Sequence, residues 1–203
     1  MVQINIYGTG GHALVIADIV RALGCEIGCF YDDAPRYSDL DSVKILKPSD
    51  CEVTGPVIIA IGDNNTRRRI AQSLQTEFAT AVHPTAIVSP SAKVGEGTVV
   101  MHGAIIQARA TVGCHSIINT GASVDHECRI GDYVHISPHA TLCGNVQVGD
   151  NSWIGAASVL IPGIKVGRNS IVGAGSVVNH NVPDNVVVCG NPARIIKKLN
   201  NNA

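Results

Sequence analysis

The sequence predicts a small α/β domain followed by a parallel β-helix and a short C-terminal tail. Two observations carry this prediction: a glycine-rich turn between an apolar strand and a helix near the N-terminus, and a strict six-residue repeat through the second half of the chain. The chain has 203 residues, which is enough for two small domains. We place the boundaries at residues 1–82, 83–182 and 183–203.

The repeat occupies residues 87–182, which divide into sixteen consecutive six-residue units without an insertion. A six-residue period fits neither an α-helix nor an ordinary half-buried strand. It is the period of a parallel β-helix, in which three units close a triangular coil and successive coils stack through backbone hydrogen bonds. The second residue of every unit is aliphatic: Val88, Val94, Val100, Ile106, Val112, Ile118, Val124, Ile130, Ile136, Leu142, Val148, Ile154, Leu160, Val166, Val172 and Val178.

The composition agrees with a thin prism. Its interior has no room for rings, and the whole chain contains only one Trp, four Tyr and two Phe. A β-sandwich would need alternating strands and hairpin turns that the regular units lack. No apolar run is long enough to span a membrane.

The first 82 residues follow a different pattern, which predicts a Rossmann-like domain. Strands are expected at 4–7, 26–31 and 57–61, and helices at about 14–23 and 65–75, the second capped by Asn64. Strand, glycine turn, helix and strand in this order are typical of a parallel sheet with crossover helices.

The glycine turn predicts a phosphate-bearing ligand. Gly8-x-Gly10-x-x-Ala13 matches the dinucleotide fingerprint, with Asp32 near the expected distance after it. A unit of about 80 residues is too short for both halves of a dinucleotide fold, so a nucleotide-sugar fits better. Its phosphate would approach the helix N-terminus, and the acid would accept hydrogen bonds from the ribose or base. A tight turn without a ligand is the alternative.

The repeat resembles that of the left-handed β-helix acyltransferases. Over essentially the entire chain, the order of the two domains resembles the PglD and NeuD group of bacterial sugar acetyltransferases. The resemblance implies left-handed coils, a homotrimer, acetyl-CoA in the groove between neighbouring prisms, and a nucleotide-sugar in the N-terminal domain. It also implies a tail with a strand at 186–189 and a closing loop at 190–194, after which we expect a helix at 195–199.

The resemblance extends to individual residues. The substrate-binding residues that it implies are Gly10, Gly11, His12, Asp32, Asp33, Gly62 and Asn64. In the β-helix it implies His126 and Glu127 as the catalytic pair. The contacts to acetyl-CoA that it implies are His135, Ala156, Gly173, Ala174 and Gly175.

The chemistry of acyl transfer supports His126 independently. Transfer from a thioester to an amine or hydroxyl needs a base, and imidazole has an ordinary pKa near 6.5. Asp125 and Glu127 flank His126, but strand alternation prevents both from contacting the ring in the same way. Residues eighteen apart stack, which places Gly144 over His126. Its N–H is a candidate oxyanion donor, although a simple corner glycine is equally compatible.

The histidines of the repeat also raise a zinc alternative, because gamma-class carbonic anhydrases hold zinc in the same fold at the trimer interface. No two are eighteen residues apart, so none stack on adjacent coils of one chain, and we expect no metal. His83, which precedes Pro84, is expected to be structural. The repeat histidines are His102, His115, His126, His135 and His139.

Charge and cysteine usage predict neither nucleic-acid nor membrane partners. The net charge is −1, and the basic runs at 67–69 and 197–198 are expected to be solvated surface. The seven cysteines are scattered without a CxxC pair, and no signal peptide is recognised. We therefore expect apolar filler cysteines and a cytoplasmic protein.

These observations predict an acetyl-CoA-dependent acetyltransferase of bacterial glycan biosynthesis, N-acetylating the amine of a UDP-4-amino-4,6-dideoxy sugar. O-acetylation of sialic acid or another sugar hydroxyl is the nearest alternative. A zinc hydratase and a non-catalytic nucleotide-sugar-binding partner are alternatives from other classes.

Overall fold

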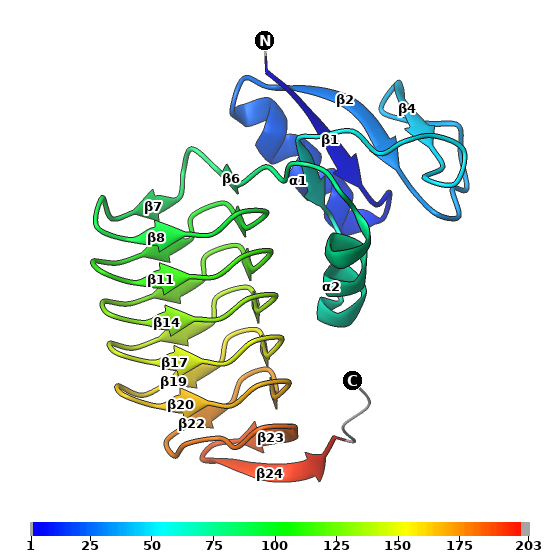
Figure 1. Ribbon diagram of the computed structural model, residues 1–203. Coiled ribbons are helices and arrows are strands. Elements are labelled where there is room, and N and C mark those ends of the chain that lie inside the picture. Colours follow the sequence, from blue (N-terminus) through cyan, green and yellow to red (C-terminus); the bar gives the residue numbers. More distant parts are fainter. Residues whose placement is uncertain (1, 200–203) are drawn as a thin grey trace.

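The computed structural model describes residues 2–199, in which a mixed α/β domain adjoins a tall β-helix (Figure 1). The α/β domain has one five-stranded sheet with the order β3-β4-β2-β1-β5. All pairings are parallel except that of β3 with β4. The elements of this domain are β1 (Gln3–Tyr7), α1 (Gly11–Ala22), β2 (Glu26–Tyr31), β3 (Asp39–Leu40), β4 (Val43–Leu46), β5 (Val57–Ile59) and α2 (Asn64–Ser73).

The predicted parallel sheet is confirmed, with corrections at its ends. The short strands β3 and β4 were not predicted, and β5 ends two residues earlier than expected. Asn64 is the first residue of α2 and not its cap. The cap is Asp63, whose Oδ1 accepts a hydrogen bond from the Thr66 N–H at 2.8 Å.

The β-helix contains one two-residue strand in each of the sixteen units, and the aliphatic residue is the second of every strand. Ile106, for example, pairs with Val88 and Val124, which are eighteen residues away on either side. The strands are β7 (Ile87–Val88), β8 (Lys93–Val94), β9 (Val99–Val100), β10 (Ile105–Ile106), β11 (Thr111–Val112), β12 (Ile117–Ile118), β13 (Ser123–Val124), β14 (Arg129–Ile130), β15 (His135–Ile136), β16 (Thr141–Leu142), β17 (Gln147–Val148), β18 (Trp153–Ile154), β19 (Val159–Leu160), β20 (Lys165–Val166), β21 (Ile171–Val172) and β22 (Val177–Val178).

The stacked strands form three faces. The first face contains β7 and every third strand up to β22, the second contains β8 to β20, and the third contains β9 to β21. The coils are left-handed, as predicted. We call the turns from the first to the second face the first corner, those from the second to the third face the second corner, and those from the third to the first face the third corner. Columns such as Ile118, Ile136 and Ile154 fill the interior with no exposed surface.

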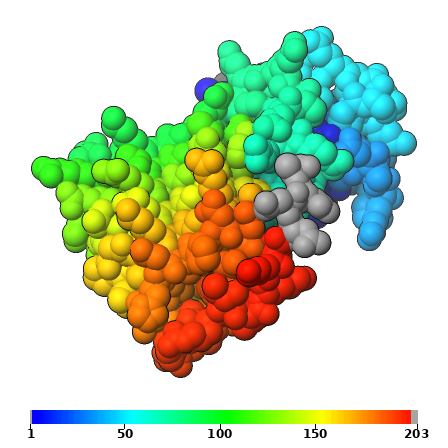
Figure 2. Space-filling view, turned by 60° about the horizontal axis from the view of Figure 1, so that its bottom comes forward, coloured from blue at the N-terminus to red at the C-terminus, as the bar shows by residue number. Residues whose placement is uncertain are grey.

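The predicted C-terminal helix is wrong. The tail is a hairpin of β23 (Val186–Gly190) and β24 (Ala193–Lys198), and β23 pairs with β21 to extend the third face. A helix of five residues is marginal by itself, whereas the free edge of β23 offers hydrogen-bond partners at once. Figure 2 shows the hairpin, in red, at one end of the prism.

The two domains share one apolar core. β6 (Ala81–Val82) pairs with β9, so the third face begins before the predicted boundary at residue 82. Ile16 and Phe30 of the α/β domain belong to the same buried cluster as Val99 and Ile117 of the β-helix. The α/β domain therefore packs on the upper part of the third face.

The cysteines are all free thiols in the described residues, and only part of the filler prediction holds. Cys128 is fully buried in the prism, where burial raises its pKa to about 11. Cys51, by contrast, is exposed. Neither helix between residues 2 and 199 combines the length and apolarity needed to cross a membrane.

Candidate functional site

The carboxyl ends of β1, β2 and β5 lie side by side because these strands pair in parallel. The turns that follow them therefore form one crevice, which is where open α/β sheets bind ligands. A side chain added at Gly10, Gly11 or Gly62 would meet no atom within 4 Å, so these backbones border open space. The N-terminus of α1 has no side-chain cap at Gly10, and its N–H groups are available to an anion.

The two acids of the crevice have different surroundings. Asp32 accepts hydrogen bonds from the Thr9 hydroxyl and, at 2.9 Å, from the Ala34 N–H, so its side chain shapes the turns. Asp33 is exposed and accepts one hydrogen bond from the Tyr7 hydroxyl at 2.8 Å. Burial and the Asp33 carboxylate raise the pKa of Tyr7. Asp33 is therefore the acid with an oxygen free for a ligand.

A groove of about 1300 Å³ lies between α2 and the lower part of the β-helix. Its walls include three arginines and two acids, Arg68, Arg69, Arg168, Asp63 and Asp184. Asp63 and Asn64, which directly follow Gly62 of the crevice, line this groove, so the groove and the crevice are neighbours. The sequence placed Arg69 on a solvated face and gave no sign that it lines a groove.

Asn64 lies at the junction of the two domains. Its side chain is 8% exposed, and its Nδ2 donates to the Asn151 and Ser152 carbonyls at 3.2 and 3.1 Å. Its Oδ1 accepts a hydrogen bond from Arg67 at 2.7 Å. The amide nitrogen therefore joins the two domains, while Asn64 also lines the groove, and its role in substrate binding stays a prediction.

Arg67 is a second correction. The sequence predicted a solvated arginine, but its side chain is only 1% exposed and contacts both domains. Beside it, Phe78 packs edge-on against His115 at 4.6 Å between ring centroids, and the Arg68 guanidinium lies 5.9 Å from the centre of the Tyr133 ring. Besides packing on the third face, the α/β domain therefore contacts the second corner through these residues.

His12 and His135 face this junction from opposite sides. Burial, and next the charge of Arg67, lowers the pKa of His12 to about 4. Burial, then Arg67 and His12, lowers the pKa of His135 to about 3. Both rings are therefore neutral at neutral pH. The Nε2 atom of His12 and the Nδ1 atom of His135 are buried without a protein hydrogen-bond partner in the described structure.

The tautomer of His135 follows from its neighbours. The Thr120 N–H donates to Asn119 Oδ1 at 2.8 Å, which fixes the orientation of the amide. Asn119 Nδ2 then faces His135 Nε2 at 3.0 Å, so Nε2 accepts and Nδ1 carries the proton. Trp153 stacks on the ring with an interplanar angle of 4°, and its Nε1 donates to Ser137 at 2.6 Å.

Sequence reasoning missed three neighbours of His135: Asn119, Ser137 and Trp153. The eighteen-residue offset between stacked coils could have identified them, because Trp153 lies eighteen residues after His135 and Ser137 lies eighteen after Asn119. Trp153 lies on the third face and Asn119 and Ser137 lie at the third corner, where the predicted acetyl-CoA contacts also begin.

Buried neutral His135 is expected to make the fold sensitive to acid. Its folded pKa is about 3, so between that pH and about 6.5 the unfolded chain binds a proton that the folded chain does not. Stability falls as the pH falls through this window, and at pH 5 the loss is about 2 kcal/mol. His135→Gln should remove this loss, which urea unfolding at pH 7 and pH 5 would measure. An unchanged pH dependence would contradict the buried neutral ring.

His126 follows β13 at the first corner, with 58% of its side chain exposed. Glu127 has a positive φ of 59°, and its Oε2 lies 3.5 Å from Nδ1 of His126. Asp125 instead accepts a hydrogen bond from the backbone N–H of His126 at 2.7 Å. The two acids thus differ as the sequence predicted: Glu127 faces the ring and Asp125 caps the turn.

Gly144 stacks on His126, as the eighteen-residue offset predicted. A Cβ atom at Gly144 would lie 2.5 Å from both Cε1 and Nε2 of the imidazole, so only glycine leaves the ring in place. The Asn145 N–H donates to the His126 carbonyl at 2.9 Å and ties the two coils together. None of the hydrogen bonds formed within residues 2–199 uses the Gly144 N–H.

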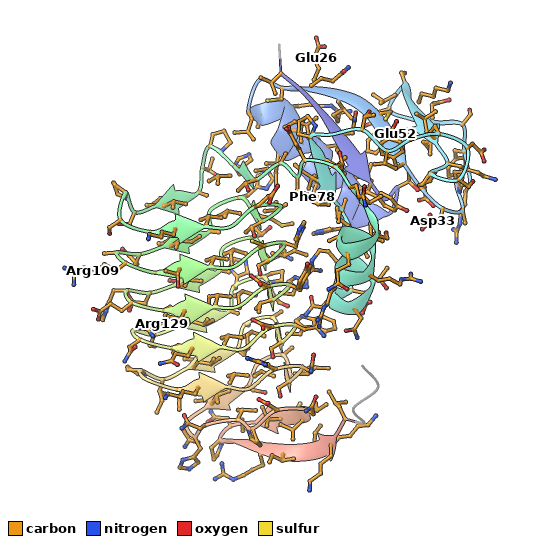
Figure 3. All side chains as sticks on the ribbon, viewed as in Figure 1. Glu26, Asp33, Glu52, Phe78, Arg109 and Arg129 are labelled. Carbon is orange, nitrogen blue, oxygen red and sulfur yellow. The ribbon has the colours of Figure 1, made fainter. Side chains whose placement is uncertain are left out.

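Within one chain, the predicted catalytic and substrate residues are not brought together. The first corner, with His126, is the edge of the prism opposite the third face, on which the α/β domain packs. Figure 3 labels Arg109, which lies 3.8 Å from Glu127, at the edge remote from Asp33. Figure 2 shows the side of the prism away from the α/β domain uncovered.

The predicted acetyl-CoA residues lie together at the third corner and the adjoining edge of the third face. Ala156 and Ala174 stack eighteen residues apart, and the Gly175 N–H donates to the Ala156 carbonyl at 2.8 Å. A side chain at Gly175 would meet nothing within 4 Å, whereas Gly173 packs against Cys189. Gly175 therefore faces open space, and Gly173 serves packing in this chain.

Residues 2–199 contain no group of three or more metal-binding side chains within one chain. His83 accepts a hydrogen bond from the Thr85 N–H at 3.1 Å and stacks on His102 at 3.7 Å between ring centroids. These contacts agree with the structural role predicted for His83.

Comparisons with known proteins cover both domains. Residues 3–74 match the model of the PglD N-terminal domain, and residues 145–180 match that of the bacterial transferase hexapeptide repeats. The chain is 35% identical to a variant of perosamine N-acetyltransferase from Caulobacter crescentus, solved with CoA and GDP-perosamine, with a TM-score of 0.90 over 97% of each chain. It is 34% identical to the acetyltransferase domain of PglB from Neisseria gonorrhoeae, with a TM-score of 0.88 over 96% of this chain and 99% of that one.

A curated relative gives a similar result over a shorter segment. The chain is 40% identical over 120 residues to UDP-N-acetylbacillosamine N-acetyltransferase from Bacillus subtilis (strain 168). That match spans 50% of this chain and 52% of the relative, so the chain matches about half the length of this curated protein. The structural matches, by contrast, extend over the α/β domain, the prism and the hairpin.

Proposed function

Because this chain belongs to the PglD family of hexapeptide-repeat sugar acetyltransferases, we propose that it transfers the acetyl group of acetyl-CoA to the amine of a nucleotide-linked amino sugar. A UDP-4-amino-4,6-dideoxy sugar is the proposed acceptor. The amine nitrogen attacks the thioester carbonyl, the C–S bond breaks, and the CoA thiolate leaves and takes up a proton.

The observation that carries this proposal is the arrangement at the first corner. Glu127 faces Nδ1 of His126, and Cε1 and Nε2 of the ring lie in the space that a Cβ atom at Gly144 would need, so Nε2 is the nitrogen left for the substrate. In the proposed mechanism, Nε2 accepts the proton of the amine as the new C–N bond forms, and Glu127 stabilises the resulting imidazolium. The Gly144 N–H donates to the developing oxyanion. The transfer is direct and needs neither an acyl-enzyme nor a metal ion.

The crevice of the α/β domain is the proposed nucleotide-sugar site. The N–H groups at Gly11 and His12 begin α1 and suit a diphosphate, and Arg69 adds positive charge nearby. Asp33 accepts hydrogen bonds from the ribose or base, and Gly62 lets the ligand approach the backbone. Asp32 shapes the turn that presents these groups.

A homotrimer is proposed because the site is incomplete in one protomer. The first face exposes 64% of Ile87 and 36% of Val159, and Ile161 at the first corner is 38% exposed. Contact of this corner with the third face of a neighbour is heterologous, and three-fold rotation closes it into a ring. His126 of one protomer then meets acetyl-CoA lying along His135, Ala156, Gly173, Ala174 and Gly175 of the next. We expect this assembly in the cytoplasm.

The reaction is tested by incubating purified protein and acetyl-CoA with a panel of UDP-, GDP-, dTDP- and CMP-sugars, with and without a free amine. Mass spectrometry should detect one added acetyl group on an amino sugar only. Acetylation of sugars that lack an amine would favour the O-acetyltransferase alternative. Absence of transfer to every sugar would contradict the proposal.

The shared site predicts that two impaired variants restore activity when mixed. His126→Ala removes the proposed base, and Asp33→Ala weakens the nucleotide-sugar crevice. In trimers formed at random from equal amounts, about a quarter of the interfaces join an intact His126 to an intact Asp33 of the neighbour. Co-refolded mixtures should therefore approach about a quarter of wild-type activity. Mixtures no more active than the better parent would place each site within one protomer.

A further inference from the structure

The Arg67 side chain is saturated with hydrogen bonds across the domain junction. A guanidinium has five N–H donors, and here all five are used. Nε donates to the His115 carbonyl at 2.7 Å, and Nη1 donates to the Ile61 and Gly62 carbonyls at 2.9 and 3.1 Å. Nη2 donates to Asn64 Oδ1 at 2.7 Å and to the Tyr133 carbonyl at 2.9 Å.

The partners of Arg67 are all neutral oxygens, which is unusual for a guanidinium that is 1% exposed. Burial lowers its pKa to about 10, so the group still carries its charge at neutral pH. Four of the five acceptors are backbone carbonyls, whose positions depend on the path of the chain. The side chain therefore holds the backbone of the α/β domain against the backbone of the β-helix. A lysine, with three donors on a flexible stem, cannot make the same set of contacts.

The carbonyls belong to two separate parts of the protein. Ile61 and Gly62 form the turn after β5, which is one wall of the crevice. His115 and Tyr133 occupy the same place in adjacent coils at the second corner. Asn64 continues the series by donating to the Asn151 carbonyl, eighteen residues after Tyr133. Three successive coils thus support the turn that carries Gly62.

We propose that Arg67 is a positioning residue. It holds the turn at Gly62 against the second corner and so fixes the position of the crevice relative to the third face. This inference rests on the proposed function, because the distance between crevice and third face matters only if the nucleotide-sugar and acetyl-CoA must meet. Arg67 itself is buried among protein oxygens and needs no contact with either substrate.

The test compares Arg67→Lys with Arg21→Lys, an exposed arginine of α1 that pairs with Asp18 and Asp41. Arg67→Lys should raise the KM for the nucleotide-sugar about tenfold or more, while the KM for acetyl-CoA stays near the wild-type value. Amide hydrogen exchange of residues 61–66 should be faster by a similar factor. Arg21→Lys should change neither measurement.

A second variant keeps the test decisive if Arg67→Lys folds poorly. Asn64→Ala removes one of the five acceptors and the bonds to the Asn151 and Ser152 carbonyls, and should shift both measurements in the same direction by a smaller factor. An unchanged nucleotide-sugar KM in a folded Arg67 variant, or equal losses for both substrates, would overturn the positioning role. The exchange comparison does not depend on catalysis, so it distinguishes failure of this inference from failure of the proposed reaction.

Discussion

Replacing His126 with alanine is expected to lower kcat by about 10²–10⁴, the range typical of losing a general base. Its imidazole is exposed at the first corner and belongs to no packed core, so the coil should fold without it. Steady-state kinetics with a fixed amino sugar would measure the change. His180→Ala, at another exposed histidine, is the matched control and should leave kcat unchanged.

Two further measurements make the result for His126 interpretable. Light scattering should show the same assembly as for the wild type, and calorimetry should show unchanged binding of acetyl-CoA. Near-wild-type turnover of a well-assembled His126→Ala protein would refute the assignment of the base. Attack by an amine that is already deprotonated in solution would then be the better mechanism.

Replacing Gly144 with alanine is expected to lower kcat by roughly 10²-fold. The added methyl group would lie 2.5 Å from Cε1 and Nε2 of His126, so the ring must move by about an ångström. A shift of that size in a catalytic group typically costs about 10²-fold in rate. The φ angle of Gly144 is not positive, so alanine brings no backbone strain there and the coil should stay intact.

The Gly144→Ala variant distinguishes displacement of the His126 ring from loss of the Gly144 N–H as a hydrogen-bond donor. The variant keeps its backbone N–H, so the loss would come from displacement of the imidazole alone. Its thermal unfolding and acetyl-CoA affinity should match those of the wild type. Full activity would mean that the ring adopts another rotamer at no cost, and that the proton is accepted from a different position.

The β-helix could be predicted almost completely because its signal repeats. Each unit makes the same contact with the unit eighteen residues away, so a single rule places every aliphatic residue inward and stacks Gly144 on His126. The unequal roles of Asp125 and Glu127 come from the turn between β13 and β14, in which Glu127 has a positive φ of 59°. Local periodicity is sufficient where every long-range contact has the same sequence separation.

The remaining features depend on contacts between segments whose separation in the sequence follows no rule. Arg67 reads as a solvated helix residue, because nothing in its neighbourhood shows that carbonyls 48 and 66 residues away will surround it. The contacts of Asn64 between the domains are hidden for the same reason, because its partners lie 87 and 88 residues further on. The tail was predicted as a helix because the free edge of β23, which made β24 a strand, exists only in the folded chain.

The sequence by itself determined the two folds, the repeat and the residue types at the first corner, because these depend on short-range periodicity and local chemistry. Only the tertiary structure decided where the α/β domain sits, through one buried guanidinium and a shared apolar core. His126 lies on the edge of the prism opposite the third face, against which that domain packs. The separation is a property of how the domains pack, and packing between domains leaves no period in the sequence.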